Sequence, residues 1–420
     1  MSFQQGVSGL NATSKNLDII GNNIANANTF GTKIARAEFA DVYANALGGG
    51  GNTAVGIGVN IAAVAQQFTQ GNISTTENPM DVAINGAGFF QMQENAKSIV
   101  YTRNGQFKVN RDGYIVNNAQ GRLMGYMADN NGAIQPGVAV PLRLPTAGVS
   151  PQATTKLDLE LNLDARAEIT APAGSPMIDF ADIDTFNNAT GLTIYDAKGQ
   201  EISMTYYFQK AAQDTWKVFA TANGVTVGGT PADPQPISTV VFSSDGGTVT
   251  SPAGNVSLDV PATVTPDGTN TLPVLGVALN FGAATQYGVP FGPTNISQDG
   301  FTAGLLVGIG VEGNGVIMAR YSNGQSKPAG QVELATFRNP QGMQPSGNNG
   351  WLRTYESGDP VVGEPGGGSR GVLQSGALEE SNIDLTKQLV DMITAQRSYQ
   401  ANAQTIKTLD QVLQTLVSLR

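Results

Sequence analysis

Few residues in this sequence could carry out chemistry. It contains no Cys and no His, which removes disulfides, thiol nucleophiles, Cys/His metal sites and imidazole acid/base catalysis. Two acidic pairs, Asp182/Asp184 and Glu379/Glu380, could in principle bind Ca²⁺ or transfer protons. Neither lies in a loop with the ligand spacing and glycine of an EF-hand, and nothing indicates a hydrolase cleft between two carboxylates. We therefore expect solvated carboxylates, no metal, no cofactor and no enzyme activity.

A glycine motif offers one further candidate. Gly308, Gly310 and Gly313 match the GxGxxG fingerprint of dinucleotide-binding proteins and follow an apolar run. A phosphate site would need a helix N-terminus directly after the glycines, whereas the following residues, "NGVIMARYSNG", alternate as in a strand. The motif therefore predicts a hairpin turn.

The composition excludes other classes of function. The net charge is -10, only 13% of the 420 residues are charged, and 52 are Gly. A chain of this kind has no basic stripe for nucleic acid or for an anionic membrane surface. No apolar run is long enough to span a bilayer, and the start of the sequence has no signal peptide pattern. We expect neither a nucleic-acid partner nor a membrane.

The elements at the two ends are helices with heptad spacing. The apolar residues Phe3, Leu10, Leu17 and Ile24 lie seven apart, with Val7 at a companion position. Leu385, Met392, Tyr399, Ile406 and Leu413 repeat the interval near the C-terminus, with Leu389 and Val417 as companions. The second helix is predicted to begin at "SNID", residues 381–384, with Ser or Asn as its N-cap, and to run to Arg420.

Two interpretations of these helices remain open. They could pack on the β core of their own chain, or they could pack against other subunits. Their other faces carry Asn, Gln, Ser and Thr, and glycine-rich stretches separate them from the middle, which favours packing between subunits. The segment "NLDIIGNNIANANTFGTK", residues 16–33, is rich in asparagine, and we expect the helix to end at Asn26 to Asn28. The predicted self-assembly interface comprises Phe3, Val7, Leu10, Leu17, Asn22, Asn23, Ile24, Asn26, Leu385, Leu389, Met392, Tyr399, Ile406, Leu413 and Val417.

The middle of the chain is predicted to be β. Short Val, Ile, Tyr and Phe runs alternate with Asn-Gly and Asp-Gly pairs, which favour hairpin turns. The predicted fold class is mainly β with a terminal α-helical coiled-coil region, with nested β domains inserted between the two helices. The expected domains are an inner helical domain (1–24 and 381–420), linkers (25–70 and 368–380), a middle β domain (71–145 and 296–367) and an inserted outer β domain (146–295).

Four stretches resemble the bacterial flagellar rod and hook family of axial proteins. They are "SGLNATSKNLDIIGNNIANANTFGTK" (8–33), "NPMDVAINGAGFF" (78–90), "YTRNGQFKVNRDGYIVN" (101–117) and the whole segment 376–420. Rod proteins of this family lack a large middle insert, so residues 146–295 point to its hook branch. A distal rod or other axial protein is the alternative, and a secreted β-rich adhesin is a more remote one.

The resemblance implies a structural role outside the cell. It implies a homopolymer that forms a curved hollow tube, transmits torque, and contacts rod, hook-capping and hook–filament junction proteins. It also implies passage through the flagellar export apparatus with the N-terminus left intact.

Overall fold

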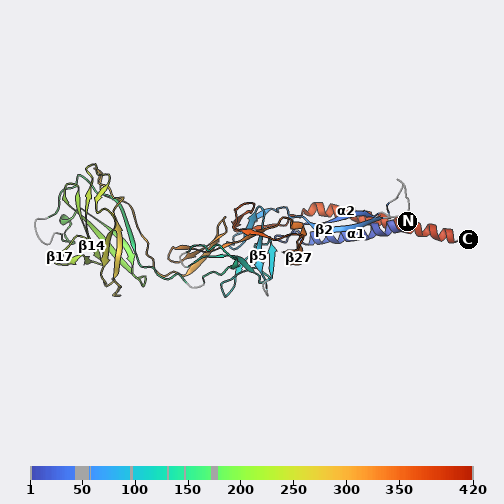
Figure 1. Ribbon diagram of the computed structural model, residues 1–420, viewed down its shortest axis with the longest axis horizontal. Coiled ribbons are helices and arrows are strands. Elements are labelled where there is room, and N and C mark those ends of the chain that lie inside the picture. Colours follow the sequence, from blue (N-terminus) through green and yellow to red (C-terminus); the bar gives the residue numbers. More distant parts are fainter. Residues whose placement is uncertain are drawn as a thin grey trace. The chain divides into compact units, whose positions relative to one another are not determined.

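The computed structural model describes residues 2–42, 56, 58–94, 98–129, 132–145, 148–171 and 178–418 (Figure 1). The chain divides into two compact units. Unit 1 comprises Met1–Thr146, Val307–Arg320 and Ser326–Arg420, and unit 2 comprises Ala147–Leu306 with Tyr321–Gln325. Strands fill the chain between two terminal helices, which confirms the predicted fold class.

Helix α1 spans Ser2–Ala25 and ends directly before Asn26. The backbone N–H of Asn26 donates to the carbonyls of Asn22 and Asn23, and its side chain donates to the Asn22 carbonyl at 2.9 Å. Asparagine side chains that bond to nearby backbone compete with helix propagation. The helix therefore ends at the place that the sequence predicted.

Helix α2 spans Leu385–Ser418 and has a different cap from the predicted one. The Asp384 carboxylate accepts a hydrogen bond from the Lys387 backbone N–H at 3.0 Å, three residues into the turn, as an N-cap does. Asn382 is not the cap because its side chain is engaged elsewhere. It accepts from the Ile34 backbone N–H and donates to the Gln67 carbonyl, both at 2.8 Å.

The region expected as the first linker contains an antiparallel hairpin. Strand β1 (Ala35–Val42) pairs with β2 (Gly58–Gln66), and α1 packs against α2, β1 and β2. Figure 1 shows α1 beside α2 and β2. We expected glycine-rich stretches to separate the helices from the β part of the chain, whereas α1 contacts β1 and β2. The residues of "GVNIAAVAQ", in which apolar and small side chains alternate, form β2, and β2 packs against α1. The glycine run predicted as a connector, 46–59, lies mostly outside the described residues.

The rest of unit 1 is β. Two small pairs join distant parts of the chain: β3 (Ile73–Thr75) with β31 (Ala377–Glu379), and β4 (Val82–Asn85) with β30 (Val372–Ser375). The large sheet has 13 strands. They are β5 (Phe89–Gln93), β6 (Ile99–Thr102), β7 (Lys108–Val109), β8 (Ile115–Val116), β9 (Arg122–Met127), β10 (Val140–Pro141), β23 (Leu306–Val311), β24 (Val316–Tyr321), β25 (Ser326–Val332), β26 (Leu334–Thr336), β27 (Gln344–Gly347), β28 (Gly350–Leu352) and β29 (Val361–Gly363).

Of the GxGxxG residues, Gly308 and Gly310 lie within β23, and Gly313 lies in the turn between β23 and β24. β23 and β24 are neighbours in the sheet, and the Glu312 N–H donates to the Val316 carbonyl at 2.8 Å to close the turn. Gly315 takes a φ of 85°, a conformation that glycine adopts without steric cost. The predicted hairpin turn is confirmed, and no helix follows the glycines as a dinucleotide site would require.

Unit 2 has two larger sheets around one core. The four-stranded sheet contains β20 (Val256–Val260), β21 (Val274–Asn280), β11 (Lys156–Asn162) and β22 (Gly292–Gln298). The six-stranded sheet contains β12 (Asn188–Tyr195), β13 (Glu201–Ala212), β14 (Thr215–Ala222), β15 (Val225–Val227), β18 (Ser238–Phe242) and β19 (Val249–Ser251). A short pair, β16 (Gly229–Thr230) with β17 (Asp233–Pro234), completes the unit.

The core of unit 2 brings both sheets together. Leu157 and Leu159 of the first sheet share one buried cluster with Tyr206 and Trp216 of the second. The two-residue turn at Asn223-Gly224, with φ of 48° and 80°, joins β14 to β15 as the sequence predicted. Residue 295, the predicted end of the insert, lies inside β22. That strand pairs with β11, so unit 2 extends beyond it.

Candidate assembly surface

Helices α1 and α2 approach each other through small residues. A side chain at Gly6 would meet the Ile406 side chain at 3.1 Å, and one at Gly9 would meet Asn402 at 3.0 Å. Ala12 on α1 and Ala395 on α2 are both buried. The contact within the chain therefore depends on glycine and alanine, and larger residues at Gly6 and Gly9 would require their neighbours to shift.

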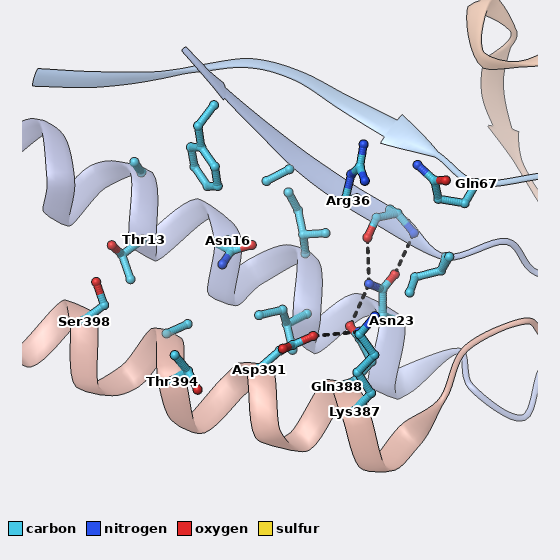
Figure 2. A pocket seen from close by; sticks show the side chains of 18 of the residues that line it. Thr13, Asn16, Asn23, Arg36, Gln67, Lys387, Gln388, Asp391, Thr394 and Ser398 are labelled. Atoms are coloured by element: carbon cyan, nitrogen blue, oxygen red, sulfur yellow. Dashed lines mark hydrogen bonds between the residues drawn. The ribbon is translucent and has the colours of Figure 1, made fainter. Parts of the chain in front are cut away.

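A buried asparagine ties the helices to the hairpin. The Asn23 amide donates to the Ala35 carbonyl at 2.8 Å and to Gln388 Oε1 at 3.0 Å, and its Oδ1 accepts from the Ala35 N–H at 3.0 Å (Figure 2). Every hydrogen bond that its side chain makes here links different elements. Burial of a polar amide is favourable only when it is bonded in this way. Asn23 therefore serves packing within the chain.

The predicted interface residues lie in several environments. On α1, Phe3 and Asn22 are exposed, whereas Val7, Leu10, Leu17, Ile24 and, just past the helix, Asn26 are half-buried. On α2, Leu385, Leu389 and Tyr399 are exposed, whereas Met392 and Ile406 are half-buried. The side chains of Leu413 and Val417 lie outside the described part of the structure.

The first turns of α2 expose an apolar stripe. Leu385, Leu389, Val390 and Ile393 leave 45%, 47%, 58% and 52% of their surface accessible. We call these four residues the apolar stripe. Exposure of this much aliphatic surface on one helix is typical of an interaction site. The buried residues of the same helix, Gln388 and Ala395, lie on a different side, toward α1.

Two grooves flank α1. The first holds about 810 Å³ between α1, α2 and the hairpin, and Figure 2 shows polar side chains from both helices along it, including Thr13, Asn16, Asp391 and Thr394. The second holds about 800 Å³ between α1 and the hairpin. Its lining is Ser8, Asn11, Ala12, Lys15, Asp18, Ile19, Asn22, Ala35, Val42, Val59, Asn60, Ile61 and Val64.

A buried charge cluster lies beyond the end of α1. Glu379 Oε1 is 2.5 Å from Lys33 Nζ, and its Oε2 is 3.0 Å from Arg103 Nη1. The three side chains are almost completely inaccessible. Burial lowers the pKa of Lys33 and of Arg103, while the Glu379 carboxylate opposes both shifts. We expected the Glu379 carboxylate to be solvated, and this was wrong.

The cluster joins four segments that are distant in the sequence. Besides its two cations, Glu379 accepts from the Gly71 N–H at 2.9 Å, and its carbonyl accepts from the Gly31 N–H at 2.8 Å. Lys33 also donates to the Thr69 carbonyl at 2.8 Å. A buried carboxylate with these partners fixes the chain after α1 to the strands beside α2. The cluster therefore serves the fold of unit 1, and Arg103 also lines a small hollow of about 250 Å³.

The described residues show no cluster suited to metal binding. No group of three or more Asp or Glu gathers there as a metal site would require. Asp182 instead caps a short 3₁₀ turn (Ile183–Thr185) by accepting from the Asp184 N–H at 3.0 Å. No helix among these residues has the length and apolar content needed to cross a bilayer.

Comparison with known proteins decides the family. Sequence profiles match at residues 3–33 (flagella basal body rod protein), 83–154 (flagellar hook protein FlgE/F/G D1 domain), 162–301 (flagellar basal body protein FlaE D2 domain) and 374–419 (flagellar basal body rod FlgEFG protein C-terminal). The chain is 37% identical to the flagellar hook protein FlgE of Salmonella typhimurium and 36% identical to that of Escherichia coli K12, each over 100% of both chains. The chain belongs to the flagellar hook protein FlgE family.

More distant relatives agree. FlgE of Borreliella burgdorferi is 32% identical over 100% of this chain and 99% of the relative. The crystal structure of Helicobacter pylori flagellar hook protein FlgE2 matches 73% of this chain and 100% of that one, with a TM-score of 0.52 and 16% identity, which shows a shared fold. The predicted resemblance to the hook branch is therefore confirmed. The matched family is one of structural proteins of the flagellar hook and basal body rod.

Proposed function

We propose that this FlgE-family chain polymerises with copies of itself into a curved hollow tube that works as a flexible joint between the motor and the filament. The apolar stripe on α2 carries the proposal. Four aliphatic side chains are left exposed although the same helix already contacts α1 through other residues. Solvent exposure of such a stripe is unfavourable for a monomer and is relieved by a neighbouring subunit.

We infer that the assembly interface includes the predicted heptad residues. In α1 these are Phe3, Val7, Leu10, Leu17 and Ile24, together with the exposed Asn22. In α2 they are Leu385, Leu389, Met392, Tyr399, Ile406, Leu413 and Val417. Exposure is greatest at Phe3, Leu385 and Leu389, so these residues gain most from a partner surface.

The remaining parts of the proposal follow from the family. The tube lies outside the cell, where its two ends meet rod, hook-capping and hook–filament junction proteins. Subunits reach it through the flagellar export apparatus. The chain has no catalytic role in this proposal.

Electron microscopy of the purified chain tests the proposal. Concentrated protein should form hollow, curved tubes of constant diameter. A chain that stays monomeric at every concentration, or forms only amorphous aggregates, would contradict it.

A further inference from the structure

The second groove has an apolar floor that no described residue of α2 covers. All its lining residues come from α1 and the hairpin. Its apolar members include Ala12 and Ile19 from the helix and Val59, Ile61 and Val64 from β2. Val64 is 53% exposed. A hollow of about 800 Å³ lies within the range, 300–1,000 Å³, of sites that bury a sizeable ligand.

The apolar stripe has the form that such a groove accepts. Leu385, Leu389 and Ile393 follow each other at four-residue steps, so they lie along one side of α2, with Val390 beside them. Amphipathic helices that bind hydrophobic grooves use anchors at this spacing. Residues of α2 line the first groove, but no described residue of α2 lines the second, so the stripe does not occupy the second groove of its own chain.

We propose that the second groove of one subunit receives the apolar stripe of another copy of the same chain. This inference rests on the proposed self-assembly and names the two surfaces that meet. The groove and the stripe are different patches, so the contact is head-to-tail. A contact of this kind leaves one free groove and one free stripe after every addition, and it extends an open polymer when the rotation between successive subunits does not close a ring.

Cysteine cross-linking tests the pairing without interference from other thiols, because the natural chain has no Cys. One preparation carries Leu389→Cys and the other carries Val64→Cys. Both positions are about half exposed in the subunit, so each variant should fold. The two are mixed, allowed to assemble and oxidised, and covalent dimers are quantified on a denaturing gel. Ile393→Cys with Ile61→Cys is a second pair across the same contact.

The matched control replaces Val64→Cys by Val225→Cys, an exposed valine on β15 of unit 2. The groove pairs should give at least about tenfold more dimer than the control, because docking raises the local thiol concentration. Tubes that form while both groove pairs stay at the control level would overturn the pairing and leave the proposed function standing. Absence of tubes from the parent chain would instead contradict the proposed function.

Discussion

The helical end of unit 1 leaves apolar side chains of α2 exposed, whereas the core of unit 2 buries its apolar side chains. Unit 2 buries Trp216 and Tyr206 completely between two sheets, so its stability does not depend on a partner. The first turns of α2 leave Leu385 and Leu389 nearly half exposed and use Gln388 and Ala395 for contact with α1. The difference indicates that unit 2 is complete as a folded body, whereas the helical end is completed by assembly.

Trp216 in unit 2 and Leu389 on α2 should differ most in what their side chains contribute to the stability of the free subunit. Trp216→Ala removes a buried indole and its 3.2 Å hydrogen bond to Gln286, and should lower the free energy of unfolding of unit 2 by about 3–5 kcal/mol. Leu389→Ala should change the stability of the free subunit by no more than about 0.5 kcal/mol, because the side chain is largely exposed. Urea unfolding of the monomers measures both. Equal losses would remove the distinction between the two regions.

The charge cluster stabilises unit 1 already in the free subunit, so not all of the stability near the helices comes from assembly. Glu379→Gln leaves Lys33 and Arg103 buried without their counter-ion and should destabilise unit 1 of the free subunit by about 3 kcal/mol or more. The control is Glu38→Gln, which breaks the exposed pair with Arg36 and should cost less than about 1 kcal/mol. Thermal unfolding of both variants shows the difference. A Glu379 variant as stable as the control would mean that the cluster does not hold the chain segments together.

A glycine beside the cluster has a smaller expected effect. Gly31 has a φ of 72°, and a Cβ there would lie 2.6 Å from the Asn104 backbone nitrogen. Gly368 has a similar φ of 62° but open space around it. Gly368→Ala should lower the free energy of unfolding by about 1 kcal/mol, because alanine is strained in the left-handed conformation. Gly31→Ala should lower it clearly more, because the neighbouring backbone must also move. Denaturant midpoints of the two variants test this order, and a smaller loss for Gly31→Ala would contradict the close packing.

The smallest expected effect is a pH dependence in the β part of unit 1. Burial, followed by the 2.6 Å hydrogen bond to Glu333, raises the pKa of Tyr126 from 10.0 to about 12. The unfolded chain loses this proton first as the pH rises, so the stabilisation is present below pH 10 and is lost between about 10 and 12. Ultraviolet titration of the native protein should show a late-titrating tyrosine that is missing in Tyr126→Phe. An unchanged titration curve would show that Tyr126 ionises normally.

Local patterns predicted much of the fold. Heptad spacing located both helices, and Asn-Gly pairs located turns such as Asn223-Gly224, because each signal comes from residues close together in the chain. The hairpin was missed because glycine and alanine around its strands resemble a flexible connector. The N-cap was misplaced because Asn382 bonds to residues more than 300 positions away.

The candidate surface was only partly predictable. Heptad counting selects large apolar residues and so passed over Gly6 and Gly9, whose lack of a side chain allows the helices to meet. The spacing of Gly6, Gly9 and Ala12 on one helix was the available signal. The pairing of Glu379 with Lys33 and Arg103 spans 346 and 276 positions, and no local pattern indicates such a contact.

We propose that the exposed stripe of α2 serves assembly and not the fold of the subunit. Leu389→Asp tests it most directly, with Thr405→Asp as the control, because Thr405 is also exposed but lies on the opposite side of the same helix. We expect both variants to remain folded monomers with the stability of the parent. Only Leu389→Asp should fail to form tubes under the electron microscope, because assembly would bury its charge at a cost of several kcal/mol. Leu389→Asp subunits that polymerise as readily as the control would show that the apolar stripe does not serve assembly.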